Sequence, residues 1–183
     1  MQREEALKIL EENLSNDKLI KHCIAVGAIM KYLARFLGED ENRWEIIGLL
    51  HDVDYEKTKD NPKLHGLVAE EILRGKVDGD MMRTIKSHNF ENNGILPEKK
   101  EDYALIASDS VSGLIIASAL VMPHKKLEEV RVETVKKKFK QKDFARNCDR
   151  GRIQFCEKIG IPLEKFLEIA LNALKEVHEE LGL

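Results

Sequence analysis

The chain is poor in the residues that disulfide frameworks, thiolate metal clusters and low-complexity segments require. Its 183 residues include 3 cysteines, 11 glycines and 4 prolines. The cysteines are odd in number, far apart and without Cys-x-x-Cys spacing, which argues against a disulfide framework and against a zinc cluster. We therefore expect a folded protein in a reduced, cytoplasmic setting.

Charge of one sign and long apolar runs are also missing. The 30 Lys and Arg residues nearly balance 33 Asp and Glu residues, so no overall basic field supports a nucleic acid partner, although none is excluded. The N-terminal segment MQREEALKILEENL shows no export signal. In the least charged stretch, Tyr103 to Pro123, only residues 110–122 follow Asp109 without charge, fewer than the roughly 20 of a membrane span. We expect a buried helix there and no membrane partner.

What the sequence does contain is apolar residues at helical spacing almost throughout. Runs rich in Val, Ile and Thr and bounded by turns, which would indicate strands, are absent. The sequence thus predicts an all-α fold. The expected helices cover about residues 4–14, 17–37, 40–50, 64–74, 79–88, 98–121 and 162–182, with Asp17 and Asp40 as capping candidates and a polar loop over residues 53–63.

A change in composition near Pro123 suggests a helical domain over residues 1–122 and a C-terminal helical extension, residues 123–183, packed on it. Residues 121–150 hold ten Lys or Arg and five Asp or Glu. This basic segment, which includes Lys136, Lys137 and Lys138, could lean over an anionic substrate or bind nucleic acid, but acidic neighbours favour a solvated face. The apolar faces of the last two helices could complete the monomer or pair two copies into a homo-oligomer.

Four polar residues stand where the hydrophobic pattern predicts a core. His51 and Asp52 directly follow the apolar run IIGLL, Asp109 is the only charged residue between Asp102 and Lys125, and His22 interrupts an apolar helical stripe. Each alone could be a satisfied core residue. Because an unpaired buried carboxylate is costly, the set together favours a metal site. Imidazole and carboxylate without thiolate indicate a divalent transition metal, namely Mn, Fe, Co, Ni or Zn.

The order His…His-Asp…Asp resembles that of the HD superfamily of metal-dependent phosphohydrolases. The resemblance covers about residues 18–122, and it is greatest to a bacterial and archaeal subgroup with His-Asp-x-Asp-Tyr-Glu and Ser-Gly-Leu-Ile-x-Ala patterns. Here these patterns read His51-Asp52-Val53-Asp54-Tyr55-Glu56 and Ser112-Gly113-Leu114-Ile115-Ile116-Ala117. The implied fold is an HD-domain helical bundle.

The resemblance implies a ligand set for one or two metals. The first metal would be bound by His22, His51, Asp52 and Asp109, and the second by Asp52, His65 and His88. His65 and His88 could instead support the ligands or contact phosphate. The implied reaction is hydrolysis of a phosphoester or phosphoanhydride of a small molecule, with a nucleotide favoured, by metal-activated hydroxide, with Asp52 and Asp54 as catalytic residues.

Several alternatives stay open. Superfamily members that cleave cyclic dinucleotides typically follow the His-Asp pair with Ile-Gly-Lys, whereas this chain has Val53-Asp54-Tyr55. Asp54 could accept a proton from the attacking water, orient a ligand imidazole, or simply cap a loop. The lysines that could meet substrate phosphate are Lys57, Lys59, Lys63 and Lys86. An HD-type di-iron oxygenase and a non-catalytic nucleotide-binding module are the alternative functions.

Overall fold

The computed structural model describes residues 1–183 and contains helices and no strand, which confirms the all-α class. The α-helices are α1 (Arg3–Asn13), α2 (Asp17–Leu37), α3 (Glu41–Leu50), α4 (Tyr55–Thr58), α5 (Leu67–Ile72), α6 (Gly79–Ser87), α7 (Phe90–Asn93), α8 (Lys100–Leu120), α9 (Val132–Lys140), α10 (Arg150–Ile153), α11 (Leu163–Glu176) and α12 (His178–Leu181). Three 3₁₀ helices complete the fold: η1 (Pro62–Leu64), η2 (Leu127–Glu129) and η3 (Gln154–Ile159).

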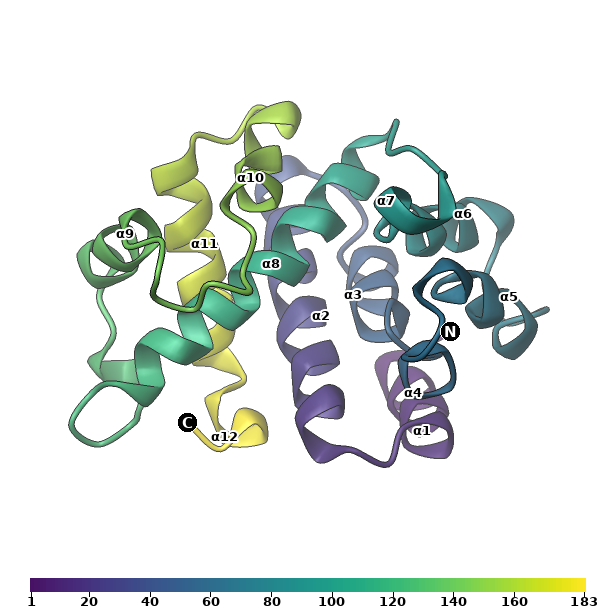
Figure 1. Cartoon of the computed structure of the whole chain (residues 1–183), viewed down its shortest axis with the longest axis horizontal. Helices are drawn as coiled ribbons and strands as arrows, with labels where there is room; N and C mark the ends of the chain where they lie inside the picture. The colour runs from purple at the N-terminus through teal and green to yellow at the C-terminus, as the bar shows by residue number, and fades with distance from the viewer.

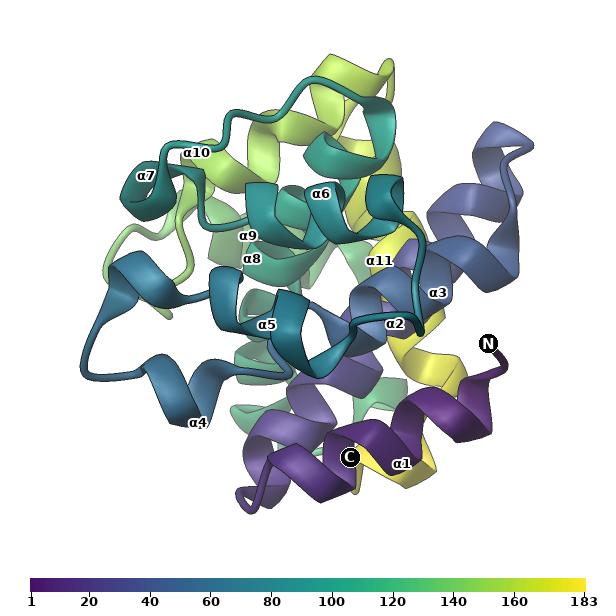
Figure 2. The same ribbon diagram turned by 90° about the vertical axis from the view of Figure 1, so that its right-hand side faces the viewer.

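Helix α8 crosses the middle of the molecule (Figure 1). Helices α2 and α11 pass behind α8 and pack against each other, α3 lies to its right, and α9 and α10 pack on it from the C-terminal part of the chain (Figure 1). The short helices α4 to α7 form the side face seen in Figure 2. The site described below lies where this face meets α2, α3 and α8.

Helices α2 and α3 form a tight hairpin because glycines face each other at their contact. A Cβ atom on Gly48 would lie 2.7 Å from the Gly27 Cα atom, closer than packed atoms allow. The connection begins at Gly38, whose φ of 72° ends α2 in the left-handed conformation. Close packing of this hairpin fixes the end of α3, where His51 follows.

The helix caps agree only in part with the expected ones. The Asp40 side chain accepts a hydrogen bond from the Arg43 backbone N–H at 2.9 Å, which confirms it as the cap of α3. The cap of α2 is Asn16 instead of Asp17, since the Asn16 side chain accepts from the Lys18 backbone N–H at 3.0 Å. Asp17 is the first helical residue and forms an ion pair with Lys21.

The short elements differ most from the predictions. The expected loop over residues 53–63 contains α4 and η1, and residues 123–160, for which no helix was predicted, contain η2, α9, α10 and η3. The expected last helix is divided at Val177, whose φ of −102° and ψ of 19° interrupt it. Helices of one or two turns are stabilised mainly by tertiary contacts, so periodicity along the chain signals them weakly.

Helix α8 is long and apolar enough to cross a membrane by length and composition alone, and 61% of its apolar segment is buried in this structure. Ala104, Leu105, Val111, Leu114 and Ile115 on this helix are fully buried against other helices. Such burial is that of the core helix of a globular fold. It agrees with the buried helix that the sequence predicts.

The C-terminal segment shares one hydrophobic core with the rest of the chain. Ile153, Phe166 and Leu174 belong to the same buried cluster as Leu33 and Leu105. Helix α11 packs on α2 and α8, and α10 and η3 pack on α8. The division into a domain over residues 1–122 and an extension over residues 123–183 stays a prediction. The packing brings residues from both segments to one pocket.

Candidate metal centre

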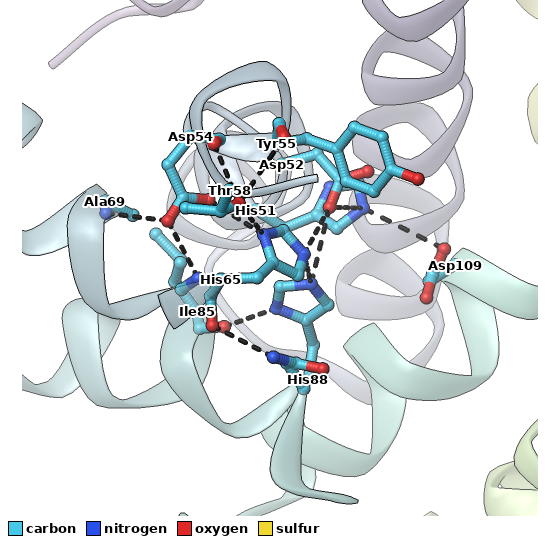
Figure 3. A network of polar contacts seen from close by, with 12 residues as sticks. His51, Asp52, Asp54, Tyr55, Thr58, His65, Ala69, Ile85, His88 and Asp109 are labelled. Atoms are coloured by element: carbon cyan, nitrogen blue, oxygen red, sulfur yellow. Dashed lines mark hydrogen bonds and ion pairs between the residues drawn. The ribbon is translucent and has the colours of Figure 1, made fainter. Parts of the chain in front are cut away.

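Six side chains from five separate segments converge at one place. They come from α2, the end of α3, the turn before α5, the end of α6 and the middle of α8, and are His22, His51, Asp52, His65, His88 and Asp109. Figure 3 shows the two imidazoles of His65 and His88 beside Asp52, with Asp109 approaching from α8. All six residues singled out in the sequence therefore meet.

The Asp52 carboxylate lies at the centre of the group. Its Oδ1 atom is 3.1 Å from Nε2 of His65, 3.4 Å from Nε2 of His88 and 3.4 Å from Nε2 of His51. Its Oδ2 atom is 3.7 Å from Nε2 of His22. Each of the two oxygens thus faces imidazole nitrogens, which is the placement expected of a carboxylate able to bridge two cations.

The donor atoms divide into two sets of metal-ligating type that share Asp52. One set is His22, His51 and Asp52, the other is Asp52, His65 and His88, and the atoms of each set lie within 4.8 Å of one another. Asp109 extends the first set, because its Oδ1 atom is 3.2 Å from Nε2 of His22 and 3.9 Å from Nε2 of His51. These groups could hold one or two metal ions.

Backbone carbonyls orient two of the imidazoles toward the centre. Nδ1 of His51 contacts the Gly48 carbonyl oxygen at 2.8 Å, and Nδ1 of His88 contacts that of Ile85. A ring that donates through Nδ1–H presents a lone pair at Nε2, as a metal ligand must. Nε2 of His51 is buried and has no hydrogen-bond partner. A buried nitrogen without a partner fits a site designed to hold a cation.

Asp54 orients a third imidazole, that of His65, from the side away from the centre. Its Oδ1 atom accepts a hydrogen bond from Nδ1 of His65 at 2.9 Å, and its Oδ2 atom accepts from the backbone N–H groups of Gly66 at 2.8 Å and Ala69 at 3.0 Å. The side chain is fully buried. Of the roles considered from the sequence, this geometry favours orientation of a ligand imidazole, since both oxygens are occupied away from the centre.

The electrostatics of the site keep His51 neutral and His65 charged. Burial lowers the pKa of His51 to about 4. Burial also disfavours the imidazolium of His65, but hydrogen bonds to Asp52 and Asp54 outweigh this effect and raise its pKa to about 10. Burial opposes ionisation of Asp52, yet the surrounding imidazoles hold the pKa of its carboxyl well below the usual range. The protein alone therefore balances the central carboxylate with a protonated histidine.

The site opens into a cavity of about 400 Å³. The residues lining it are His22, Asp52, Tyr55, His65, His88, Asn89, Asp109, Ser110, Gly113, Asn147, Cys148, Asp149 and Arg152. The side chains of His22 and Asp109 are each 24% exposed at its edge. The expectation that α8 buries the Asp109 carboxylate is thus corrected: solvent reaches it through the pocket.

Two charged residues of the pocket, Arg152 and Asp149, were not predicted from the sequence. Nη2 of Arg152, on α10, lies 3.3 Å from Oδ2 of Asp109. Arg152 lies two residues beyond the basic segment of residues 121–150, whose local excess of positive charge was the available signal nearby. The lysines suggested as phosphate contacts are absent from the lining; Lys57 instead donates to Asn13, and Lys86 pairs with Glu70.

The remaining histidines and the cysteine beside His22 take no part in the centre. His124 is exposed and pairs with Glu129, and His178 lies in α12. Cys23 is fully buried, and burial raises the pKa of its thiol well above the usual value. These residues therefore have packing or surface positions outside the centre.

Comparison with known proteins gives the family. The HD domain model matches residues 19–181 and continues through the C-terminal helices. Ribonuclease Y 2 of Bdellovibrio bacteriovorus is 26% identical over 93 residues, which are 50% of this chain and 17% of that protein. The chain thus corresponds to a small part of that relative. No solved structure gives a significant match. Since the family match covers most of the chain and includes all six converging residues, the chain belongs to the HD domain family.

Proposed function

We propose that this chain is a metal-dependent phosphohydrolase that cleaves a phosphoester or phosphoanhydride of a small molecule, with a nucleotide as the favoured class. HD domains are generally metal-dependent hydrolases that bind divalent metals, and the chain has His and Asp groups that could hold such an ion. The observation that carries the proposal is the buried Nε2 atom of His51, which has no hydrogen-bond partner although it faces two carboxylates.

The proposed ligand sets follow the two groups of donor atoms. His22, His51, Asp52 and Asp109 would bind one divalent transition metal (Mn, Fe, Co, Ni or Zn). Asp52, His65 and His88 would bind a second. Support comes from the shared Asp52 carboxylate, whose Oδ1 and Oδ2 atoms face different imidazoles.

The protein residues orient the donors, and a metal ion bound at His65 would displace the proton that this imidazole otherwise holds. Metal ions bound here would supply an activated water nucleophile and neutralise the charge that develops on the phosphoryl group. Asp52 is the proposed bridging carboxylate, and the Gly48 and Ile85 carbonyls hold two imidazoles with Nε2 toward the centre. Asp54 is proposed as a positioning residue for His65 in place of a proton acceptor, because its two oxygens are already hydrogen-bonded.

The pocket supports a substrate of nucleotide size. A cavity of about 400 Å³ lies within the usual range of small-molecule sites. Tyr55 is 41% exposed at this pocket, where its ring meets the edge of His65 with centroids 5.5 Å apart. Such an aromatic ring can pack against a base or sugar. The name of the Bdellovibrio relative also makes a short RNA worth testing as substrate. A reducing, cytoplasmic setting is part of the proposal, because all three cysteines are free.

The test combines metal analysis with a panel of phosphorylated metabolites, including nucleotides and a short RNA. Purified protein should contain a first-row transition metal and hydrolyse a member of the panel. Asp52→Ala should lose almost all metal, His51→Ala should lose the metal of the first set, and both should lose activity, while His124→Ala, which changes an exposed histidine outside the centre, should retain metal and activity. Full metal occupancy and turnover in either of the first two variants would overturn the assigned ligands.

Two results would favour the other functions instead. Iron-dependent oxygen consumption without phosphate release would indicate an oxygenase. Tight nucleotide binding by the metal-loaded protein, with the nucleotide intact after hours, would indicate a binding module.

A further inference from the structure

Arg152 is the only lysine or arginine among the residues that line the metal pocket. The other charged side chains there, apart from the histidines, are the carboxylates of Asp52, Asp109 and Asp149. A phosphorylated ligand that enters this pocket therefore meets a single permanently cationic side chain. Guanidinium groups suit phosphate because their planar array of donors can bind two of its oxygens at once.

The Arg152 guanidinium is fixed in place but not saturated. Nη2 donates to the His88 carbonyl oxygen at 2.7 Å and to Oδ2 of Asp109 at 3.3 Å, and Nη1 donates to Oε2 of Glu91 at 3.0 Å. These bonds use three of its five N–H groups, and the rest have no acceptor within the protein. The two N–H groups left, on Nε and on Nη1, belong to a side chain that is 16% exposed and lines the pocket.

A second arginine, Arg150, organises the loop of residues 141–149 that precedes Arg152. This loop is called the wall of the pocket below. The Arg150 guanidinium donates to six backbone carbonyl oxygens, those of Lys138, Phe139, Gln141, Phe144, Ala145 and Cys148. The segment from the end of α9 to the start of α10 thus curves around the Arg150 side chain. Within this segment Ala145 has a φ of 45°, a conformation that an alanine adopts only when its surroundings impose it.

The same wall packs directly on α8, where Cys148 contacts Gly113, one turn beyond Asp109. A Cβ atom on Gly113 would lie 2.8 Å from Sγ of Cys148, so the loop packs where α8 has no side chain. The Asp149 side chain then accepts from the Arg152 backbone N–H at 3.0 Å and begins α10. Residues 147–152 are therefore held as a defined side of the pocket.

We propose that Arg152 is the phosphate-binding residue of this pocket, and that the wall of residues 141–149, organised by Arg150, sets its position. The inference rests on the proposed phosphohydrolase function, and it assigns substrate recognition to the C-terminal part of the chain. The phosphate would lie between the free guanidinium donors and the cations held by Asp52 and Asp109. Arg150 acts through the loop and is a positioning residue.

The test measures inorganic phosphate binding to the metal-loaded full chain by calorimetry, together with metal content. Arg152→Gln should weaken phosphate binding about tenfold or more with metal content unchanged, as expected for loss of a charge-assisted contact. Arg152→Lys should restore part of the affinity. Arg150→Met, which leaves Arg152 in the chain, should also weaken binding. Arg146→Gln, on the exposed surface of the same loop, should bind like the wild type.

The outcomes separate this inference from the proposed function. Phosphate affinity of Arg152→Gln within twofold of the wild type overturns the inference, even if the wild type hydrolyses a substrate. Loss of metal together with phosphate also overturns it, because Arg152 would then only hold Asp109. Phosphate binding that depends on Arg152 in a protein that hydrolyses no phosphorylated compound supports the inference and contradicts the proposed function.

Discussion

Asp54 Oδ1 accepts a hydrogen bond from Nδ1 of His65 at 2.9 Å, while its other oxygen accepts from two backbone N–H groups at the start of α5. The carboxylate therefore ties the direction of one imidazole to the position of a helix. A carboxylate behind a ligand histidine fixes the ring and raises its basicity. Asp54 thus links the stability of the α4–α5 region to the binding properties of the centre.

We expect Asp54→Asn to weaken metal binding about 10–100-fold, the usual effect of removing such a carboxylate. It should also lower the melting temperature. The Asn side chain has an NH₂ group where the carboxylate has its second oxygen, and if this group faces the Gly66 and Ala69 N–H groups, those two donors lose their acceptor. Metal titration and thermal melts of the metal-free protein would check both effects. Asp102→Asn is the matched control, since it changes a buried carboxylate away from the centre and should leave metal affinity unchanged.

The two donor sets predict different effects of removing one histidine. His22→Ala should leave the set of Asp52, His65 and His88 intact, and His88→Ala should leave the set of His22, His51 and Asp52. Either variant should therefore retain about half of the metal bound by a wild type that holds two ions, whereas Asp52→Ala should retain almost none. Elemental analysis after dialysis measures this. Equal metal content in Asp52→Ala and His22→Ala would contradict a bridging role for Asp52.

The sequence allowed the principal residues of the centre to be found because each breaks an apolar helical pattern. His22, His51 and Asp109 lie on long helices or at their ends, where periodicity is strong and the resemblance to a known order is specific. The role of Asp54 could not be chosen among its alternatives in this way. Its backbone partners are the N–H groups of Gly66, which precedes α5, and of Ala69 in α5, and their position depends on how α5 packs on α6 and η1.

Arg152 was missed for a related reason. It lies 43 residues beyond Asp109, after an irregular loop whose path follows from the hydrogen bonds of the Arg150 guanidinium and not from periodicity. Composition showed only that the region is basic. The pocket is lined by residues from both sides of the expected division near residue 122, so its C-terminal wall depends on tertiary packing that a division by composition does not predict.

The close approach of α2 and α3 predicts that Gly48 tolerates no side chain. In Gly48→Ala the new Cβ would be 2.7 Å from Gly27 Cα, a backbone atom that cannot rotate away. We expect a loss of about 1–3 kcal/mol in the free energy of unfolding. Metal affinity should fall as well, because the Gly48 carbonyl orients His51. Denaturant melts and metal titration would measure these effects. Gly79→Ala, which has open space at the start of α6, should show neither.

The Asp102 carboxylate gives the fold a predictable dependence on pH. Burial opposes its ionisation, but hydrogen bonds from the Glu98 and Lys99 backbone N–H groups and from Thr84 and Arg83 lower its pKa below the usual value. Because the folded pKa is below the unfolded one, the unfolded chain binds the proton more readily. The stabilisation is therefore fully present above the unfolded pKa of about 3.9, and is lost as the pH falls through the folded value.

Comparison of the wild type with Asp102→Asn measures this contribution. At pH 7 the variant should be less stable by about 2 kcal/mol, since its amide group leaves buried donors without acceptors, and this corresponds to about 4–8 °C in melting temperature. The gap should narrow as the pH is lowered below about 4, because Asp102 of the unfolded wild-type chain then takes up a proton that the folded chain still excludes. Lys99→Gln, which removes an exposed partner of Asp80, serves as the control and should show almost no difference at either pH. A gap that stays constant from pH 7 to pH 3 would show that the ionised form of Asp102 does not stabilise the fold.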